Sequence, residues 1–297
     1  MNVKSIIEIK DLVKKYNKGF VLGEINLDIP KGFSTALIGA NGAGKTTLMD
    51  VLCGICEKTS GEIKYFGQTD NIDYGNIKER IGYCAASSYF PMDWKVKDVK
   101  RSMSAAFKGF SEERFDRLLE EFDIKSSFTK TIAKLSDGNK MRLYLAAVLA
   151  RETELLVLDE PGSALDPLMR DRLCDRFRDY LDKGDGKNSI IFSTHNIADM
   201  ENAADYAVIM SKGKIIEKGF IEDLKAKYIS FSADASAAER LRGYAVTLTK
   251  GSVNANGLAL AEYAGKFTDA GAAIETPDLQ RLSVELLRAE EDNHART

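Results

Sequence analysis

The sequence predicts an α/β fold built around a phosphate-binding loop, with an antiparallel β edge subdomain, an inserted helical subdomain and a small C-terminal extension. Three observations predict it. Apolar strand patterns alternate with amphipathic helix patterns over most of the chain, which is typical of a parallel sheet covered by helices. A glycine-rich loop at 39–46 follows one of these strands directly and opens a helix. The periodicity becomes purely helical from about Trp94.

The first elements are strands. From Ile6 to Asp28 short apolar runs are punctuated by Asn17, Gly19 and Gly23, which predicts an antiparallel meander. After a Pro-Lys-Gly turn, the run FSTALIG has the pattern of a buried strand and leads through the glycine-rich loop into an amphipathic helix beginning near Thr46. The order strand, phosphate loop, helix is therefore expected here.

The middle of the chain predicts a helical insertion followed by a return to α/β order. Segments between Trp94 and Phe128 have helical periodicity, with Ser111 as an N-cap, and predict a helical subdomain at about 94–150. The later elements are expected in this order: a helix at 141–151, a strand at 155–161, a helix at 168–181, a strand at 189–195 and a strand pair at 207–219.

The composition changes after about Lys227, where Ala, Gly and Ser become frequent. We expect weak strands at 244–250 and 258–265 and a final amphipathic helix after Pro277. The predicted division is a larger α/β domain at 1–227 and an extension at 228–297.

Composition excludes several classes of protein. The 297 residues include 42 basic and 45 acidic side chains, a formal charge of −3, which gives no support to overall attraction to nucleic acid. We find no uninterrupted apolar stretch of about 18 residues and no signal-like start, so we expect a cytoplasmic protein. Cys53 and Cys56 form a C-x-x-C pair without a second pair or a nearby histidine, and we expect reduced thiols.

The loop GANGAGKT at 39–46 fits the pattern G-x-x-x-x-G-K-[ST] in the required strand-to-helix context. Glycines let successive backbone N–H groups point at phosphate oxygens, and the helix N-terminus adds its field. Lys45 should reach the β- and γ-phosphates of ATP, and Thr46 should ligate Mg²⁺. The expected nucleotide contacts from this segment are Asn41, Gly42, Ala43, Gly44, Lys45, Thr46 and Thr47.

Two carboxylates end the strand LLVLDE. Asp159 and Glu160 come at the carboxyl end of this strand, where a doubly wound sheet places its ligand. We expect Asp159 to hold Mg²⁺ and Glu160 to polarise the attacking water. Alone this pattern is weak, because acidic residues end many strands, but together with the phosphate loop it predicts an ATP-hydrolysing site.

The segment LSDGN at 135–139 opens a helix before Asp159 and resembles the LSGGQ signature of ABC ATPases. The resemblance covers roughly Ile6 to Gly219 and rests on several motifs in the order of that family. It implies that Ser136 and the N–H groups near Gly138 contact ATP held by the phosphate loop of a second subunit, so that ATP closes a dimer.

Other positions take their expected roles from the same resemblance. Tyr16 matches the aromatic residue that stacks on adenine, although it could equally be an ordinary strand residue. The segment 163–166 matches the D-loop that meets the partner subunit. His195 matches the switch histidine that contacts the γ-phosphate, whereas a lone histidine at a strand end usually has no such role.

The sequence departs from the family pattern in two places. Ala86 stands where the family has a glutamine that senses Mg²⁺ and water, with Ser87 and Ser88 as the nearest polar side chains. Asp137 stands where glycine is usual, and its charge should oppose a nearby γ-phosphate unless Lys140 or Arg142 screens it. Both departures predict slow or partner-dependent hydrolysis.

The resemblance implies a subunit that drives a separate transmembrane permease, together with a second ATPase subunit. We favour a homodimer over a heterodimer. The ending ETPDLQRLSVELL resembles that of drug, antimicrobial-peptide and lipid exporters, which favours export, while an importer subunit or a regulatory ABC protein without transport remains the alternative. Tyr89, Phe90 and Trp94 form an aromatic group that either docks the permease or belongs to the local core.

Overall fold

The computed structural model describes residues 3–17, 19–69, 74–86, 90–124, 127–195, 197–198, 200–251 and 254–295, so Ser87, Ser88 and Tyr89 lie outside the described residues. Its centre is a mixed sheet in the order β10-β9-β3-β8-β7-β6. The strands are β3 (Ser34–Ile38), β6 (Ile81–Cys84), β7 (Leu155–Leu158), β8 (Ser189–Thr194), β9 (Tyr206–Ser211) and β10 (Lys214–Phe220). All neighbours pair in parallel except β9 and β10, and the predicted α/β fold is confirmed.

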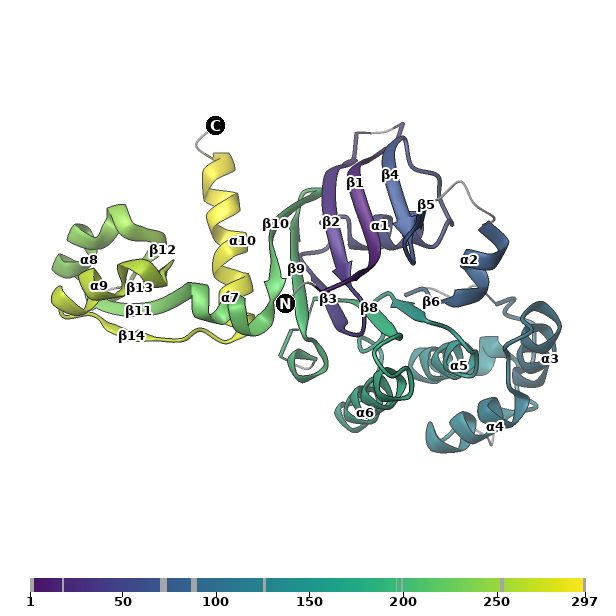
Figure 1. The fold of residues 1–297 in the computed structure, drawn as a ribbon. Coiled ribbons are helices and arrows are strands. Elements are labelled where there is room, and N and C mark those ends of the chain that lie inside the picture. The colour runs from purple at the N-terminus through teal and green to yellow at the C-terminus, as the bar shows by residue number, and fades with distance from the viewer. Residues whose placement is uncertain are drawn as a thin grey trace.

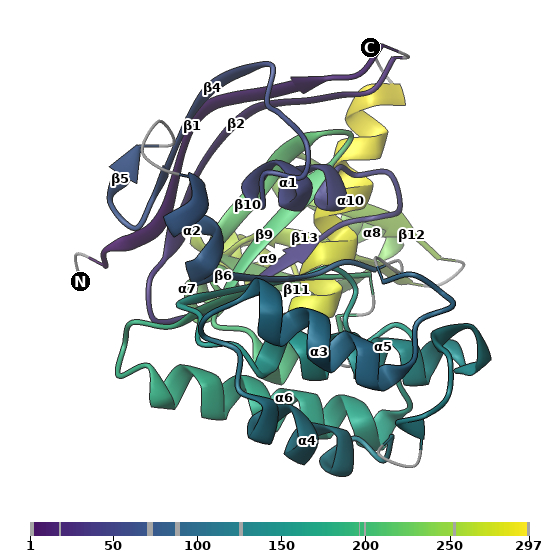
Figure 2. The same ribbon diagram turned by 90° about the vertical axis from the view of Figure 1, so that its right-hand side faces the viewer.

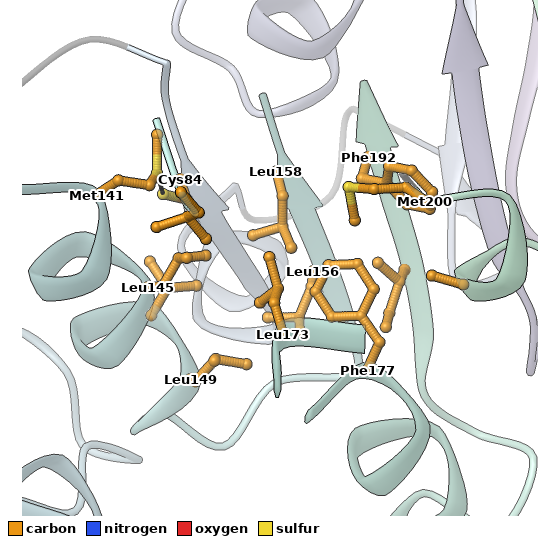
Figure 3. Packing of buried hydrophobic residues seen from close by; sticks show 14 of the residues in the cluster. Cys84, Met141, Leu145, Leu149, Leu156, Leu158, Leu173, Phe177, Phe192 and Met200 are labelled. Atoms are coloured by element: carbon orange, nitrogen blue, oxygen red, sulfur yellow. Dashed lines mark hydrogen bonds between the residues drawn. The ribbon is translucent and has the colours of Figure 1, made fainter. Parts of the chain in front are cut away.

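Two hydrophobic clusters lie on opposite faces of this sheet because successive side chains of a strand point to opposite sides. On one face Leu156 and Phe192 pack with residues of α5 (Asp137–Leu149) and α6 (Pro167–Lys183), as Figure 3 shows. On the other face the strands pack with α1 (Lys45–Leu52) and the N-terminal strands. The strands of the sheet centre are buried on both faces, which explains their continuous apolar runs.

The antiparallel edge comprises β1 (Ser5–Lys15), β2 (Val21–Pro30), β4 (Ser60–Tyr65) and β5 (Gln68–Thr69), in the order β2-β1-β4-β5. The predicted antiparallel pairing of the first two strands is present. The strand β4, which follows the phosphate loop and α1 in the sequence, pairs with the other edge of β1. The short helix α2 (Tyr74–Arg80) then leads into β6.

The helical segment contains α3 (Val96–Ala106), α4 (Glu112–Glu121) and a 3₁₀ turn, η2 (Ile132–Lys134), before α5. Ser111 is the N-cap of α4, as expected, and its hydroxyl accepts a hydrogen bond from the Arg114 N–H. Phe90 is buried and its ring lies 6.3 Å from that of Trp94 and 5.6 Å from that of Tyr144. Phe90 and Trp94, two members of the predicted aromatic group, therefore belong to the local core.

The C-terminal segment forms a separate sheet that the sequence indicated only in part. The elements are β11 (Tyr228–Asp234), α8 (Ala235–Leu241), β12 (Ala245–Lys250), β13 (Asn254–Leu260), α9 (Ala264–Asp269) and β14 (Ala273–Glu275). Their order β12-β13-β11-β14, with antiparallel pairs throughout, is the βαββαβ arrangement. The strand expected at 258–265 is wrong in its second half, because β13 ends at Leu260 and a 3₁₀ turn and α9 follow.

The last helix, α10 (Leu279–Ala295), lies between this C-terminal sheet and the central one (Figures 1 and 2). It contacts β12 and β13 on one side and β9, β10 and α7 (Ile221–Lys227) on the other. Leu279 and Leu282 are completely buried. Within the part of the chain that the structure describes, no helix is long and apolar enough to cross a membrane.

Candidate functional site

The loop between β3 and α1 has a backbone that only glycine accommodates easily. Gly42 and Gly44 have φ angles of 82° and 104°, in the left-handed region that other residues avoid. A Cβ atom at Gly39 would collide with the carbonyl oxygen of Met210 in β9. The Gly213 N–H donates to the Ala43 carbonyl at 2.9 Å, so the turn between β9 and β10 holds the loop in place.

The loop encloses a pocket of about 300 Å³. Its lining residues are Phe20, Asn41, Gly42, Ala43, Gly44, Lys45, Thr46, Thr47 and Glu160. Lys45 is buried, and its Nζ donates to the Gly39 carbonyl at 2.7 Å and lies 3.8 Å from Glu160 Oε1. Burial lowers the pKa of Lys45, while the carboxylates of Glu160 and Asp159 act in the opposite direction. The ammonium group is thus held inside the loop that would bind phosphate.

The carboxylate of Asp159, which is 1% exposed, joins three elements. Thr46 Oγ1 donates to Asp159 Oδ2 at 2.8 Å from α1, and Ser193 Oγ donates to Oδ1 at 2.5 Å from β8. Hydroxyl and carboxylate oxygens are the ligands that Mg²⁺ prefers, so this pair fits the metal. Among the described residues, no cluster of three or more His, Cys, Asp or Glu side chains that could hold a metal occurs.

Glu160 lies between a cation and a histidine. Its Oε2 is 2.7 Å from His195 Nδ1, and its other oxygen is the one near Lys45. The Glu160 N–H donates to Ser193 Oγ at 2.8 Å, and its φ of 50° is unusual for a residue other than glycine. The site therefore fixes the backbone of Glu160 and presents its carboxylate at the phosphate-loop pocket, where it can act as a base on water.

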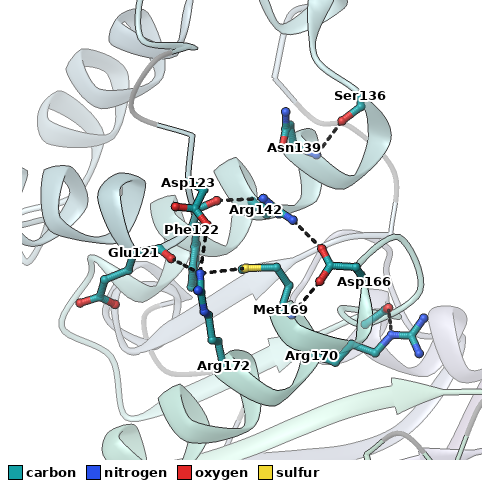
Figure 4. A network of polar contacts seen from close by, with 11 residues as sticks. Glu121, Phe122, Asp123, Ser136, Asn139, Arg142, Asp166, Met169, Arg170 and Arg172 are labelled. Carbon is teal, nitrogen blue, oxygen red and sulfur yellow. Dashed lines mark hydrogen bonds and ion pairs between the residues drawn. The ribbon is translucent and has the colours of Figure 1, made fainter.

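The signature segment is placed elsewhere. Ser136 is the N-cap of α5 and accepts from the Asn139 N–H at 3.3 Å (Figure 4). The described lining of the phosphate-loop pocket includes no residue of 135–139. Asp137 is 87% exposed and pairs with Lys140 at 2.9 Å. Of the two cations expected to screen Asp137, the structure therefore places Lys140 beside it.

Arg142, the other expected screening cation, has a different partner. Its guanidinium lies 2.7 Å from Asp166, the N-cap of α6, and also donates to the Phe122 carbonyl (Figure 4). Arg142 thus contacts Asp166 and the Phe122 carbonyl, and the structure gives no support to the expectation that Arg142 screens Asp137. Instead, Arg142 ties the signature helix to the end of the 163–166 segment.

An aromatic residue that sequence reasoning missed lines the pocket. Tyr16 is 42% exposed, and its hydroxyl lies 3.8 Å from Cys56 Sγ rather than on the pocket wall. Phe20, with its ring 6.5 Å from that of Tyr16, does line the pocket. The available signal was a second aromatic residue at the start of β2. Ser193 was also missed, although it stands two residues before His195 on the same strand.

A larger cavity of about 690 Å³ adjoins the expected metal ligands. Thr46 and Asp159 line it together with Ala86 and with Met103 and Phe107 from the end of α3. The register supports the assignment of Ala86, because Cys84 pairs with Leu158 and the Asp159 N–H donates to the Cys84 carbonyl. A methyl group therefore faces the cavity where the family pattern has an amide.

All four cysteines are free and lie within the described part of the chain. Cys53 is buried, and desolvation raises the pKa of its thiol well above its usual value.

Comparison with known proteins gives concordant matches. The family model described as ABC transporter matches residues 22–163. An uncharacterized ABC transporter ATP-binding protein of Bacillus subtilis, YxlF, is 32% identical over 243 residues, which are 80% of this chain and 79% of that protein. The bacitracin transport ATP-binding protein BcrA of Enterococcus faecalis is 29% identical over 81% of this chain and 79% of its own. A solved ATP-binding subunit of an ABC transporter superposes with a TM-score of 0.67 and 28% identity, covering 74% of this chain and 92% of that one.

Proposed function

The chain belongs to the ABC transporter family and is an ATP-hydrolysing subunit of that family, and from this premise we propose that two copies close around two ATP molecules to drive a separate transmembrane permease. The observation that carries the proposal is the position of Glu160 at the phosphate-loop pocket, with Lys45 near one carboxylate oxygen and His195 beside the other. Cation, carboxylate and histidine converge where a γ-phosphate and water would react.

The proposed roles follow the contacts of each side chain. Lys45 and the loop N–H groups bind the phosphates, with the contact set Asn41, Gly42, Ala43, Gly44, Thr46 and Thr47. Thr46 and Asp159 would hold Mg²⁺, which neutralises phosphate charge when bound. Glu160 polarises water, and His195 orients Glu160 and contacts the γ-phosphate. Tyr16 and Phe20 offer ring faces for the adenine.

A second subunit is proposed because the signature segment stands apart from the pocket of its own chain. Ser136 and Gly138 lie at the exposed start of α5, a helix N-terminus suited to phosphate. Residues 1–227 form the ATPase domain in this proposal, with the helical subdomain at about 94–150, and residues 228–297 form the extension. A homodimer is favoured, and a heterodimer with an unequal second site is the alternative.

We place the protein at the cytoplasmic face of the membrane, held by its permease. The cavity beside Ala86, between α1, β6 and α3, is the proposed docking surface, and Ile55 on its rim is 64% exposed. Export of a peptide, drug or lipid is favoured by the C-terminal PDLQRLSVELL segment and by the similarity to a protein of bacitracin transport. An importer subunit and a regulatory ABC protein without transport are the alternatives, and co-purification of a multi-span membrane protein separates the latter from a transporter.

The deciding experiment is the oligomeric state of purified Glu160→Gln, measured by light scattering with and without ATP and Mg²⁺. This change keeps the shape of the side chain but removes the base, so bound ATP should persist and the protein should shift from monomer to dimer. Glu154→Gln, the same substitution at the opposite end of β7, is the matched control and should not trap the dimer. A Glu160→Gln monomer that still binds ATP would overturn the homodimer.

A further inference from the structure

Glu201 connects the C-terminal helix with the segment that carries His195. It begins the 3₁₀ turn η3 (Glu201–Ala203), six residues after His195. Its Oε1 accepts a hydrogen bond from the Leu279 N–H at 3.2 Å, at the start of α10, and lies 2.9 Å from Lys225 Nζ in α7. The hydrogen bond that Lys225 donates to Glu201 is the largest cause of the raised pKa of Lys225. One carboxylate oxygen therefore joins three elements.

The residue before Glu201 touches the catalytic segment. Met200 is 2% exposed, and a Cβ atom at Gly162 would lie 3.1 Å from its Sδ. Gly162 stands two residues after Glu160. The Met200 N–H donates to the carbonyl of Ile197, which stands two residues after His195, at 3.0 Å. A shift of Glu201 would thus move Met200 against Gly162 and change its hydrogen bond to Ile197, and these two residues each stand two positions from one partner of the Glu160 to His195 contact.

The other end of the connection lies in the C-terminal sheet. Thr247 Oγ1 in β12 donates to Glu285 Oε2 in α10 at 2.6 Å and accepts from the Leu258 N–H in β13 at 3.0 Å. Thr247 and Glu285 are both buried. A buried hydrogen bond of this kind resists rearrangement, because losing it would leave one buried carboxylate oxygen without this donor while Arg288 pairs with the other oxygen. Movement of β12 and β13 is therefore expected to carry α10 and its first N–H group with it.

We propose that Glu201 is a positioning residue for ATP hydrolysis, through which α10 and the C-terminal sheet hold His195 and Glu160 in their reactive arrangement. The proposal rests on the function proposed above. The extension then acts as a control element: when its sheet and α10 are docked, Glu201 fixes η3 against Gly162, and when they shift, the catalytic contact loosens. Small displacements suffice, since misplacement of about 1 Å can cost roughly 100-fold in rate.

The test compares Glu201→Ala with Glu201→Gln and Glu222→Ala in the full chain, by steady-state ATP hydrolysis. Glu201→Ala loses the acceptor and should lower kcat by about ten-fold while KM changes less than about two-fold, because the phosphate loop is untouched. Glu201→Gln keeps an oxygen for Leu279 and Lys225 and should retain most of the activity. Glu222 also approaches Lys225, at 3.8 Å, but is 89% exposed, so Glu222→Ala serves as the matched control with unchanged activity.

Amide hydrogen exchange gives a readout that does not need turnover. Exchange in the peptide containing Met200 and Glu201 should rise several-fold in Glu201→Ala, and also in Thr247→Val, which removes the distant hydrogen bond to Glu285. If the wild type hydrolyses ATP and Glu201→Ala matches it in kcat and exchange, the inference is overturned while the proposed function stands. If the wild type neither binds nor hydrolyses ATP yet Thr247→Val raises exchange at Met200, the proposed function fails and the coupling through α10 is supported.

Discussion

Gly138 lies so close to Ala164 that a Cβ atom at position 138 would come within 2.8 Å of the Ala164 carbonyl oxygen. The backbone of Ala164 in the 163–166 segment therefore packs directly against Gly138 of the signature segment in the same chain. The ion pair between Arg142 and Asp166 reinforces this contact. Two segments expected to meet a partner subunit are thus fixed relative to each other before any partner arrives. This arrangement makes a specific prediction for Gly138.

Replacing Gly138 by Ala should displace one of the two segments, because a backbone oxygen cannot move aside as a flexible side chain can. We expect ATP-dependent dimer formation to weaken by about ten-fold, equivalent to about 1.4 kcal/mol, while the monomer binds nucleotide as before. Light scattering and fluorescent-nucleotide titration in a Glu160→Gln background measure the two quantities. Gly265→Ala, where an added Cβ meets nothing within 4 Å, is the control; equal effects of both changes would refute the steric argument.

Removing the charge of Asp137 should favour the closed dimer. Asp137→Gly, or Asp137→Asn as the purely electrostatic version, leaves Lys140 free to meet phosphate, so less ATP should be needed for half-maximal dimerisation. Titration of dimer against ATP provides the measurement. Asp175→Asn, which breaks an equivalent i,i+3 pair with Arg178 in α6, should change nothing. An absence of gain for Asp137→Gly would count against charge repulsion at this position.

Supplying an amide at position 86 should accelerate hydrolysis. Ala86 shares the cavity with Thr46 and Asp159, so a glutamine there has room and reaches polar groups beside the expected metal. We expect Ala86→Gln to raise kcat several-fold, with ATP affinity little changed. Ala85 lines the same cavity, so Ala85→Gln tests whether the effect depends on the position of the amide. A rate unchanged in Ala86→Gln would mean that the missing amide does not limit turnover.

The pair formed by Arg80 and Glu154 should make stability depend on pH. Two hydrogen bonds from Arg80, at 2.6 and 2.9 Å, hold the pKa of Glu154 below its usual value. A depressed carboxylate pKa adds stability above the unfolded pKa of about 4.3, and that stability is lost as pH falls through the folded value.

The substitution Glu154→Gln should therefore lower the thermal midpoint at pH 7 more than at pH 3.5. Both side chains are 34% exposed, so solvent limits the effect to about 0.5–1 kcal/mol. Thermal unfolding followed by circular dichroism at the two pH values measures it. A difference between wild type and variant that is the same at both pH values would contradict the assignment.

Local motifs made the nucleotide site predictable, and long-range contacts explain what was missed. The glycines and Lys45 of the phosphate loop, the carboxylates after β7 and the N-cap Ser111 are readable from neighbouring residues alone. Glu201 gains its place from a segment far along the chain, because it meets Leu279 across 78 positions. No local pattern carries that information.

The C-terminal sheet was underestimated for a related reason. Small residues dominate it, and β11 has one face formed by Ile229, Phe231 and Ala233 against α8 and α9 while its other face lies toward α10. Alternation of polar and apolar side chains, the usual strand signal, is weak when both faces are covered. The ring contact of Phe231 with Phe267, at 4.6 Å, becomes apparent only when the two elements are assembled.

The position of α10 also has a consequence for biosynthesis. The helix fills a space against β9 and β10, yet it is translated after every other element that the structure describes. At about 5–20 residues per second, several seconds separate the emergence of β10 from that of α10. During this interval the apolar surface that Leu279 and Leu282 later cover is open to solvent on the nascent chain. A chaperone or a second subunit would first bind the nascent chain at that surface. A ribosome that stalls within α10 would leave the same apolar surface exposed on the ATPase domain.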